Sequence, residues 1–131
     1  MLTEKDYCDY ETCVALKELG CIGQGRHYYD LDKDPKELRH FGIQVLTTRS
    51  AEALNFVLAI HLYDAQKWLR EEKNLNVNVR AFVKDGWYYT IQYCDGNPLI
   101  SLLSVTDDLH KTYEEALLEG IKEAIKILKE E

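Results

Sequence analysis

The chain has 131 residues, of which 46% are hydrophobic, and its 23 acidic and 16 basic residues give a formal net charge of −7. This length and apolar content fit one core, so we predict a single domain over residues 1–131. The longest apolar run, residues 53–60, is far shorter than the roughly 20 residues of a membrane-spanning helix, and residues 1–9 are charged rather than apolar. We therefore predict a cytoplasmic protein that contacts no membrane and keeps its four cysteines reduced.

The acidic residues are concentrated in the last third of the chain. From residue 85 onward, ten acidic residues stand against four lysines, whereas the preceding part is close to balanced. Proteins that bind nucleic acids neutralise the phosphate backbone with lysine and arginine, and an acidic surface repels it. The charge distribution therefore argues against a nucleic-acid partner.

The first predicted element is a helix over residues 9–19. Cys13 and Leu16 lie on its apolar side, and Gly20 is a typical stop signal directly after it. Residues 21–29 then predict a loop that enters a short extended piece.

The next segments are shorter and less regular. Asp34 as N-cap and Pro35 as the first helical residue predict a helix of one turn. Residues 43–46 predict a strand. Residues 54–60 fit either a buried strand or the start of a helix, since so short an apolar run has no distinguishing period.

Two runs of alternating residues, 77–83 and 87–93, predict a β-hairpin. A three-residue loop at 84–86, with Gly86 in the left-handed conformation of a bulge, sets apolar side chains against apolar side chains. The predicted pairs are Val83 with Trp87, Ala81 with Tyr89, and Val79 with Ile91. A two-residue loop would instead set apolar residues against polar ones.

Further elements flank this hairpin. A turn at residues 95–98 leads into a third strand at 99–105, and the apolar spacing from Leu62 onward predicts a helix before the hairpin. Residues 113–128 predict an amphipathic helix, capped by Thr112 with Glu115 reaching back in a capping box. The predicted fold is α+β: an N-terminal helix, then a helix, a three-stranded antiparallel meander and a C-terminal helix packed on one sheet face.

Polar and aromatic residues occupy the opposite face of the predicted hairpin. Arginine and large aromatic residues are frequent at the energetic centres of protein interfaces, although strands also favour aromatics for their own packing. The alternation predicts that this face holds the partner-binding residues, which are Arg80, Phe82, Tyr88, Thr90 and Gln92. Coverage of the face by residues 21–60 is the alternative.

No motif for catalysis, metal binding or cofactor binding emerges from the sequence. Cys8, Cys13 and Cys21 contain no C-x2-C pair, and the spacing of His27 and His40 matches no established ligand pattern. No serine lies in a G-x-S-x-G elbow. We therefore predict no catalytic residue, no metal site and no cofactor.

The runs LYDAQKWLREEKNLNVNV (62–79), YYTIQY (88–93) and TYEEALLEGIKEAIKILK (112–129) resemble small α+β proteins that recur in bacterial prophages and other mobile elements. The likeness covers the second half of the chain, and its motifs are structural rather than catalytic. In such proteins a proline often precedes the middle helix, where this chain has Ile60. The resemblance implies a phage-related accessory role and assigns no functional residue.

Together these patterns predict a non-enzymatic accessory protein of a phage or mobile element. It would bind another protein through the outer sheet face or an exposed edge strand, and self-association stays open. One alternative is an RNA-binding domain of helix, three-strand, helix topology. Another is an enzyme or small-molecule binder, which a deep pocket lined by His27, His40 or His61 with acidic residues would favour.

Overall fold

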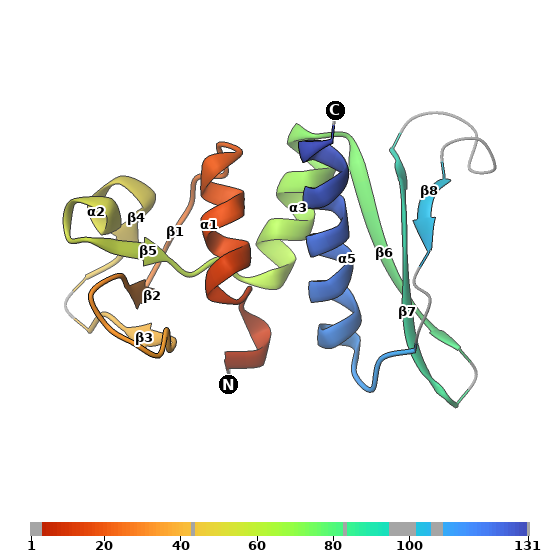
Figure 1. The fold of residues 1–131 in the computed structure, drawn as a ribbon, viewed down its shortest axis with the longest axis horizontal. Coiled ribbons are helices and arrows are strands. Elements are labelled where there is room, and N and C mark those ends of the chain that lie inside the picture. The colour runs from red at the N-terminus through yellow and green to blue at the C-terminus, as the bar shows by residue number, and fades with distance from the viewer. Residues whose placement is uncertain (1–3, 43, 83, 95–101, 106–108, 131) are drawn as a thin grey trace. The chain divides into compact units, whose positions relative to one another are not determined.

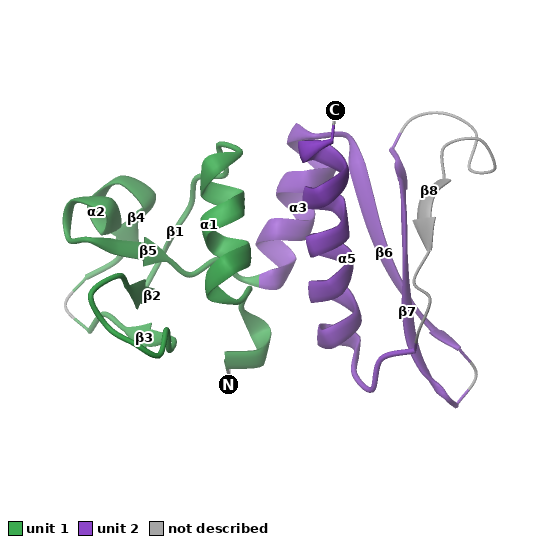
Figure 2. Cartoon of the chain, in the orientation of Figure 1, with its two compact units in different colours: residues 1–61 green, residues 62–131 purple. Residues whose placement is uncertain are grey.

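The computed structural model describes residues 4–42, 44–82, 84–94, 102–105 and 109–130. It comprises two compact units, Met1–His61 and Leu62–Glu131, and each combines helices with antiparallel strands (Figure 2). The predicted α+β class is confirmed, whereas the single domain over residues 1–131 stays a prediction. Among the described residues, no helix is both long enough and apolar enough to span a membrane.

Unit 1 consists of short elements (Figure 1). They are η1 (Glu4–Asp6), α1 (Tyr10–Glu18), β1 (Gln24–Gly25), β2 (His27–Asp30), β3 (Arg39–His40), β4 (Leu46–Thr47), α2 (Thr48–Ala53) and β5 (Phe56–Leu58). Strands β1 and β4 form an antiparallel ribbon, and β2 lies between β3 and β5 in an antiparallel sheet. The core of the unit lies where α1 and α2 contact β5.

Helix α1 begins and ends where the sequence predicts. The Asp9 carboxylate accepts a hydrogen bond of 2.9 Å from the Thr12 N–H, which satisfies one of the free donors of the first turn. At the other end the chain leaves the helix through Gly20, whose φ of +97° suits a residue without a side chain. Cys13 and Leu16 are fully buried on the apolar side.

Two predictions for the middle of unit 1 are wrong. The segment after Asp34 forms no helical turn, because the Lys36 ammonium binds the carbonyls of Leu31 and Lys33, each at 2.8 Å, and so holds the chain in a compact turn. Residue 43 of the strand predicted over residues 43–46 lies outside the described residues, and among the others strand β4 begins only at Leu46. Of the two alternatives for residues 54–60, the buried strand is correct, since β5 lies there.

Unit 2 has the predicted order of helix, three strands and helix (Figure 1). Its elements are α3 (Leu62–Glu72), β6 (Leu75–Phe82), β7 (Gly86–Tyr93), β8 (Leu102–Val105) and α5 (Tyr113–Lys129). The strands form an antiparallel meander in the order β6-β7-β8, as predicted. Both helices lie on one face of this sheet and contact each other. The predicted turn at residues 95–98 lies outside the described residues.

The predicted hairpin register is wrong by two residues. Ala81 lies opposite Trp87 and Val79 opposite Tyr89, while the last pair joins Phe82 to Gly86. The cause is a turn that begins one position earlier than expected. In this turn the Asp85 N–H donates a hydrogen bond of 3.0 Å to the Phe82 carbonyl. Because side chains alternate with a period of two, this shift leaves every residue on the predicted face.

Helix α5 packs tightly on the inner face of the sheet. A Cβ placed on Gly120 would lie 2.6 Å from Val77 Cγ1 and 3.1 Å from Tyr89 Cγ, so glycine permits a close approach of helix and sheet. Thr112 caps the helix as predicted, with its hydroxyl 3.1 Å from the Glu115 N–H. The Glu115 carboxylate reaches back to the Lys111 N–H, one residue before the donor that a capping box uses.

Candidate functional site

The first candidate site is the outer face of the β6–β7 hairpin, which we define by the side chains that point away from α3 and α5. These are Asn76, Asn78, Arg80, Phe82, Tyr88, Thr90 and Gln92. Their alternating neighbours Val77 and Ile91 are fully buried on the opposite, inner face. The register therefore brings together all five residues that the sequence predicts as partner-binding.

Within the outer face, an aromatic pair lies beside a cation. Arg80 is directly opposite Tyr88 in the ladder. The ring of Phe82 meets the ring of Tyr88 edge to face, with centroids 6.5 Å apart and planes at 78°. Phe82 remains 51% exposed despite this contact, and Arg80 is also exposed. A large apolar surface next to a positive charge is typical of a protein-binding site.

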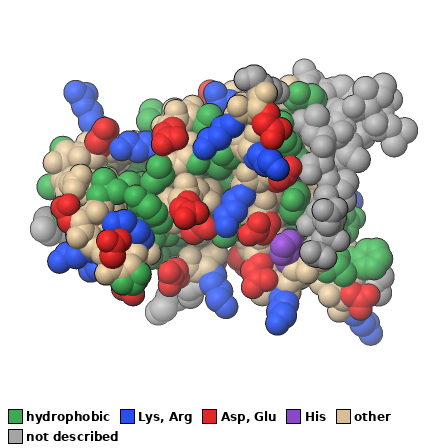
Figure 3. Space-filling model, viewed as in Figure 1, with side chains coloured by type: hydrophobic (Ala, Val, Ile, Leu, Met, Phe, Trp, Pro, Cys, Tyr) green, Lys and Arg blue, Asp and Glu red, His purple; other side chains and the backbone are tan. Residues whose placement is uncertain are grey.

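The rest of the outer face is polar and uncharged. Asn78 lies opposite Thr90, and Asn76 lies opposite Gln92; all four are partly exposed. The sequences of β6 and β7 contain no acidic residue, in contrast to the net charge of −7 of the whole chain. On the side of the molecule seen in Figure 3, acidic and basic side chains are interspersed rather than gathered by sign.

One edge of the sheet is partly protected by a side chain of α3. The Gln66 amide donates a hydrogen bond of 2.7 Å to the Val77 carbonyl, which occupies one acceptor of β6. Capping an acceptor in this way hinders the addition of another strand at that point. An edge-on partner strand would therefore meet a blocked position in the middle of β6, which favours the outer face over the edge as the binding surface.

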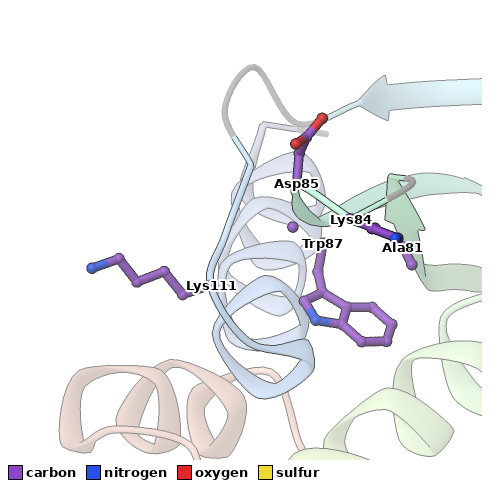
Figure 4. Close-up of a pocket in the computed structure, with 6 residues that line it drawn as sticks. Ala81, Lys84, Asp85, Trp87 and Lys111 are labelled. Carbon is purple, nitrogen blue, oxygen red and sulfur yellow. The ribbon is translucent and has the colours of Figure 1, made fainter.

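A shallow hollow of about 310 Å³ lies near the tip of the hairpin (Figure 4). Its lining residues are Ala81, Lys84, Asp85, Gly86, Trp87 and Lys111. The side chain of Lys111 extends away from Trp87, so its charge does not face the indole. A catalytic or ligand-binding pocket needs polar groups that converge on one point, and this hollow lacks such convergence.

The second candidate site is a cluster of imidazoles around Tyr7 in unit 1, called here the imidazole cluster. His27 and His40 are opposite each other on β2 and β3, with ring centroids 5.0 Å apart. The Tyr7 hydroxyl is 3.1 Å from His27 Nδ1, and the Tyr7 ring contacts the rings of His27 and His61 at 4.8 and 5.4 Å. Sequence spacing did not predict this cluster.

Burial affects the chemistry of the imidazole cluster. Removal from water, followed by the proximity of His40, lowers the pKa of His27 below its ordinary value of 6.5. His27 is therefore neutral at pH 7. Within the described parts of the chain, no group of three or more His, Cys, Asp or Glu side chains is arranged to hold a metal ion.

The buried cysteines of unit 1 are structural. Cys8, Cys13 and Cys21 are at most 5% exposed, and the Cys8 carbonyl accepts hydrogen bonds from the Cys13 thiol and the Tyr29 hydroxyl. A hydrogen bond with Cys13, together with burial, holds the pKa of the Cys8 thiol well above its ordinary value. A thiol in this environment is a poor nucleophile because it is not ionised.

Comparison with known proteins gives no relative from which to transfer a function. No protein-family model, curated protein or solved structure matches this chain.

Proposed function

We propose that this protein is a non-enzymatic accessory protein of a prophage or other mobile element, and that it binds another protein through the outer face. The observation that carries the proposal is the half-exposed Phe82, paired with Tyr88 beside Arg80, on the sheet face opposite α3 and α5. None of the described helices of unit 2 packs against this face. The association with mobile elements rests on the resemblance of the second half of the chain.

The energetics favour a partner that covers the tip of the hairpin. Burying a phenylalanine side chain fully contributes about 1.5–3 kcal/mol, so covering the exposed half of Phe82 adds about 1 kcal/mol. Tyr88 is held against Phe82 and loses little further conformational freedom on binding. Arg80 favours a partner that offers a carboxylate, since a charge-assisted hydrogen bond is stronger than a neutral one.

The RNA-binding alternative agrees with the order of elements but not with the charge. In unit 2 the helix, three-strand, helix order is present. However, the first turn of α5 carries Glu114 and Glu115. A phosphate backbone approaching that end of the helix would be repelled by two carboxylates. Protein binding is therefore the function that the surface supports best.

The test is a site-specific crosslinking experiment in cells of the native host. A photo-reactive amino acid replaces Thr90 on the outer face or, in a matched control, exposed Lys67 on α3. We expect one crosslinked partner from position 90 that is lost in the double variant F82S/Y88S. The variant Y63S, which removes an aromatic residue that is 47% exposed on α3, should keep the partner.

Circular dichroism and amide spectra of each variant establish that it is folded. Crosslinking from position 67 but not from position 90, or a partner that persists in folded F82S/Y88S, would show that the outer face is not the binding surface. An identified partner would name the process in which the protein acts.

A further inference from the structure

The imidazole cluster contains a pair of histidines that has no part in the proposed protein-binding function. His27 on β2 and His40 on β3 are direct cross-strand neighbours, although they are 13 positions apart in the sequence. Their rings are inclined at 61° with centroids 5.0 Å apart. Side chains of one cross-strand pair project from the same face of a sheet, so both rings reach the same space.

We propose that His27 and His40 together bind one late divalent transition-metal ion, of the class of Zn²⁺ and Cu²⁺, between their imidazole rings. An ion bound ~2.1 Å from one nitrogen of each ring, at a tetrahedral angle, sets the ring centroids about 5 Å apart. The observed centroid spacing of 5.0 Å is close to this requirement. Imidazole nitrogen is the ligand that zinc and copper favour among neutral side chains, whereas calcium and magnesium prefer oxygen.

Tyr7 supplies the second contact that a metal-binding histidine usually makes. Such histidines commonly donate their remaining ring N–H to an oxygen, which fixes the tautomer and the ring orientation. The Tyr7 hydroxyl lies 3.1 Å from His27 Nδ1. When Nε2 of His27 binds a metal ion, the proton of the ring is on Nδ1, which then donates to this hydroxyl. The Tyr7 ring also packs on His27 at 4.8 Å, which restricts rotation of the imidazole.

One of the two proposed ligands lies at the surface. His40 is exposed, so an ion can enter from solvent.

The site is an open one. Since the described residues include no group of three or more candidate ligands, His27 and His40 are its two protein ligands, and water takes the other positions. An open coordination sphere leaves room for a ligand from another molecule. Binding would also tie β3 to β2, a pairing that extends over only two residue pairs.

The test is calorimetric titration of the full chain with zinc chloride at neutral pH. All proteins carry Cys94→Ser, which removes the exposed thiol as a competing ligand. We expect saturable binding of one ion per chain, weakened at least about tenfold by either H27Q or H40Q. The matched control H110Q, which changes a histidine of unit 2, should bind as tightly as the parent.

A second readout locates the ion. Zinc should shift the ring-nitrogen signals of His27 and His40 in long-range ¹H–¹⁵N spectra, and a chelator should reverse the shift. Absence of saturable binding, or affinity that is unchanged in both H27Q and H40Q, would overturn the proposal. If H27Q does not fold, the exposed His40 allows H40Q to decide the question alone.

Discussion

Replacement of Gly120 by alanine tests how closely α5 must approach the sheet of unit 2. In an ordinary helix interior this change stabilises by about 1 kcal/mol, because alanine has the higher helix propensity. At this position the new Cβ would lie 2.6 Å from Val77 Cγ1 and 3.1 and 3.2 Å from two atoms of Tyr89. Val77 is fully buried and β-branched, so its side chain has few alternative rotamers.

The two effects can be compared in magnitude. Overpacking a core by one methyl group costs about 1–3 kcal/mol, which outweighs the gain of about 1 kcal/mol from propensity. We therefore expect G120A to lower the free energy of unfolding of unit 2 by about 1 kcal/mol. Truncation of the blocking side chain in V77A removes the 2.6 Å contact. In that background G120A should be neutral or stabilising by up to about 1 kcal/mol, which gives a coupling energy of about 1–2 kcal/mol.

The assay is urea denaturation followed by tryptophan fluorescence. The two tryptophans of the chain, Trp68 and Trp87, both belong to unit 2, so the signal reports on this unit. Parent, G120A, V77A and the double variant complete the cycle. If G120A is as stable as the parent, or if its effect is the same with and without Val77, the close packing of α5 on β6 is not what requires glycine.

Three further predictions concern unit 1 and the thiols. In the folded protein, Cys94 should react rapidly with a thiol reagent while the three buried cysteines react only after denaturation, as thiol counting before and after urea would show. The variant D9A should destabilise α1 by about 1 kcal/mol, because the Thr12 N–H loses its acceptor, and faster amide exchange in α1 would reveal this. The lowered pKa of His27 means that the unfolded chain binds its proton more readily than the folded one. Unit 1 should therefore lose stability as the pH falls below about 6.5, and H27Q should weaken this dependence in thermal unfolding.

The elements that the sequence predicts best are those with a long, unbroken period. Residues 113–128 predict a helix, and α5 spans Tyr113–Lys129 with Thr112 as its cap. The strands β6 and β7, each of eight residues, are long enough for their alternation to fix both faces. These elements form a core in which each buried residue recurs at a regular interval, so local pattern and tertiary packing agree.

The hairpin register could not be predicted with the same accuracy. Apolar pairing on one face is equally satisfied by registers that differ by two residues, because both keep the same side chains inside. The choice between them depends on the turn, where Gly86 has a φ of +152° and lies against the His110 carbonyl. The contact with residue 110 comes from a distant part of the chain, and no local pattern reports it.

Unit 1 was harder to predict because its strands have only two to four residues. A strand of this length shows no measurable period. The pairing of His27 with His40 depends on the turn between β2 and β3, in which Lys36 binds two backbone carbonyls. Candidate ligands brought together in this way are invisible to a search for fixed spacings such as C-x2-C.

The period of two in β6 and β7 also makes folding and binding separable in unit 2. Inner residues such as Val77 contact α5, whereas Phe82 and Tyr88 on the outer face contact each other and solvent. A polar substitution on the outer face leaves the core intact, so the cost of F82S/Y88S to stability should be limited to the lost aromatic contact, about 0.5–1.5 kcal/mol. This variant is therefore a stringent probe, since a partner that is lost while the protein stays folded must be lost through the surface itself.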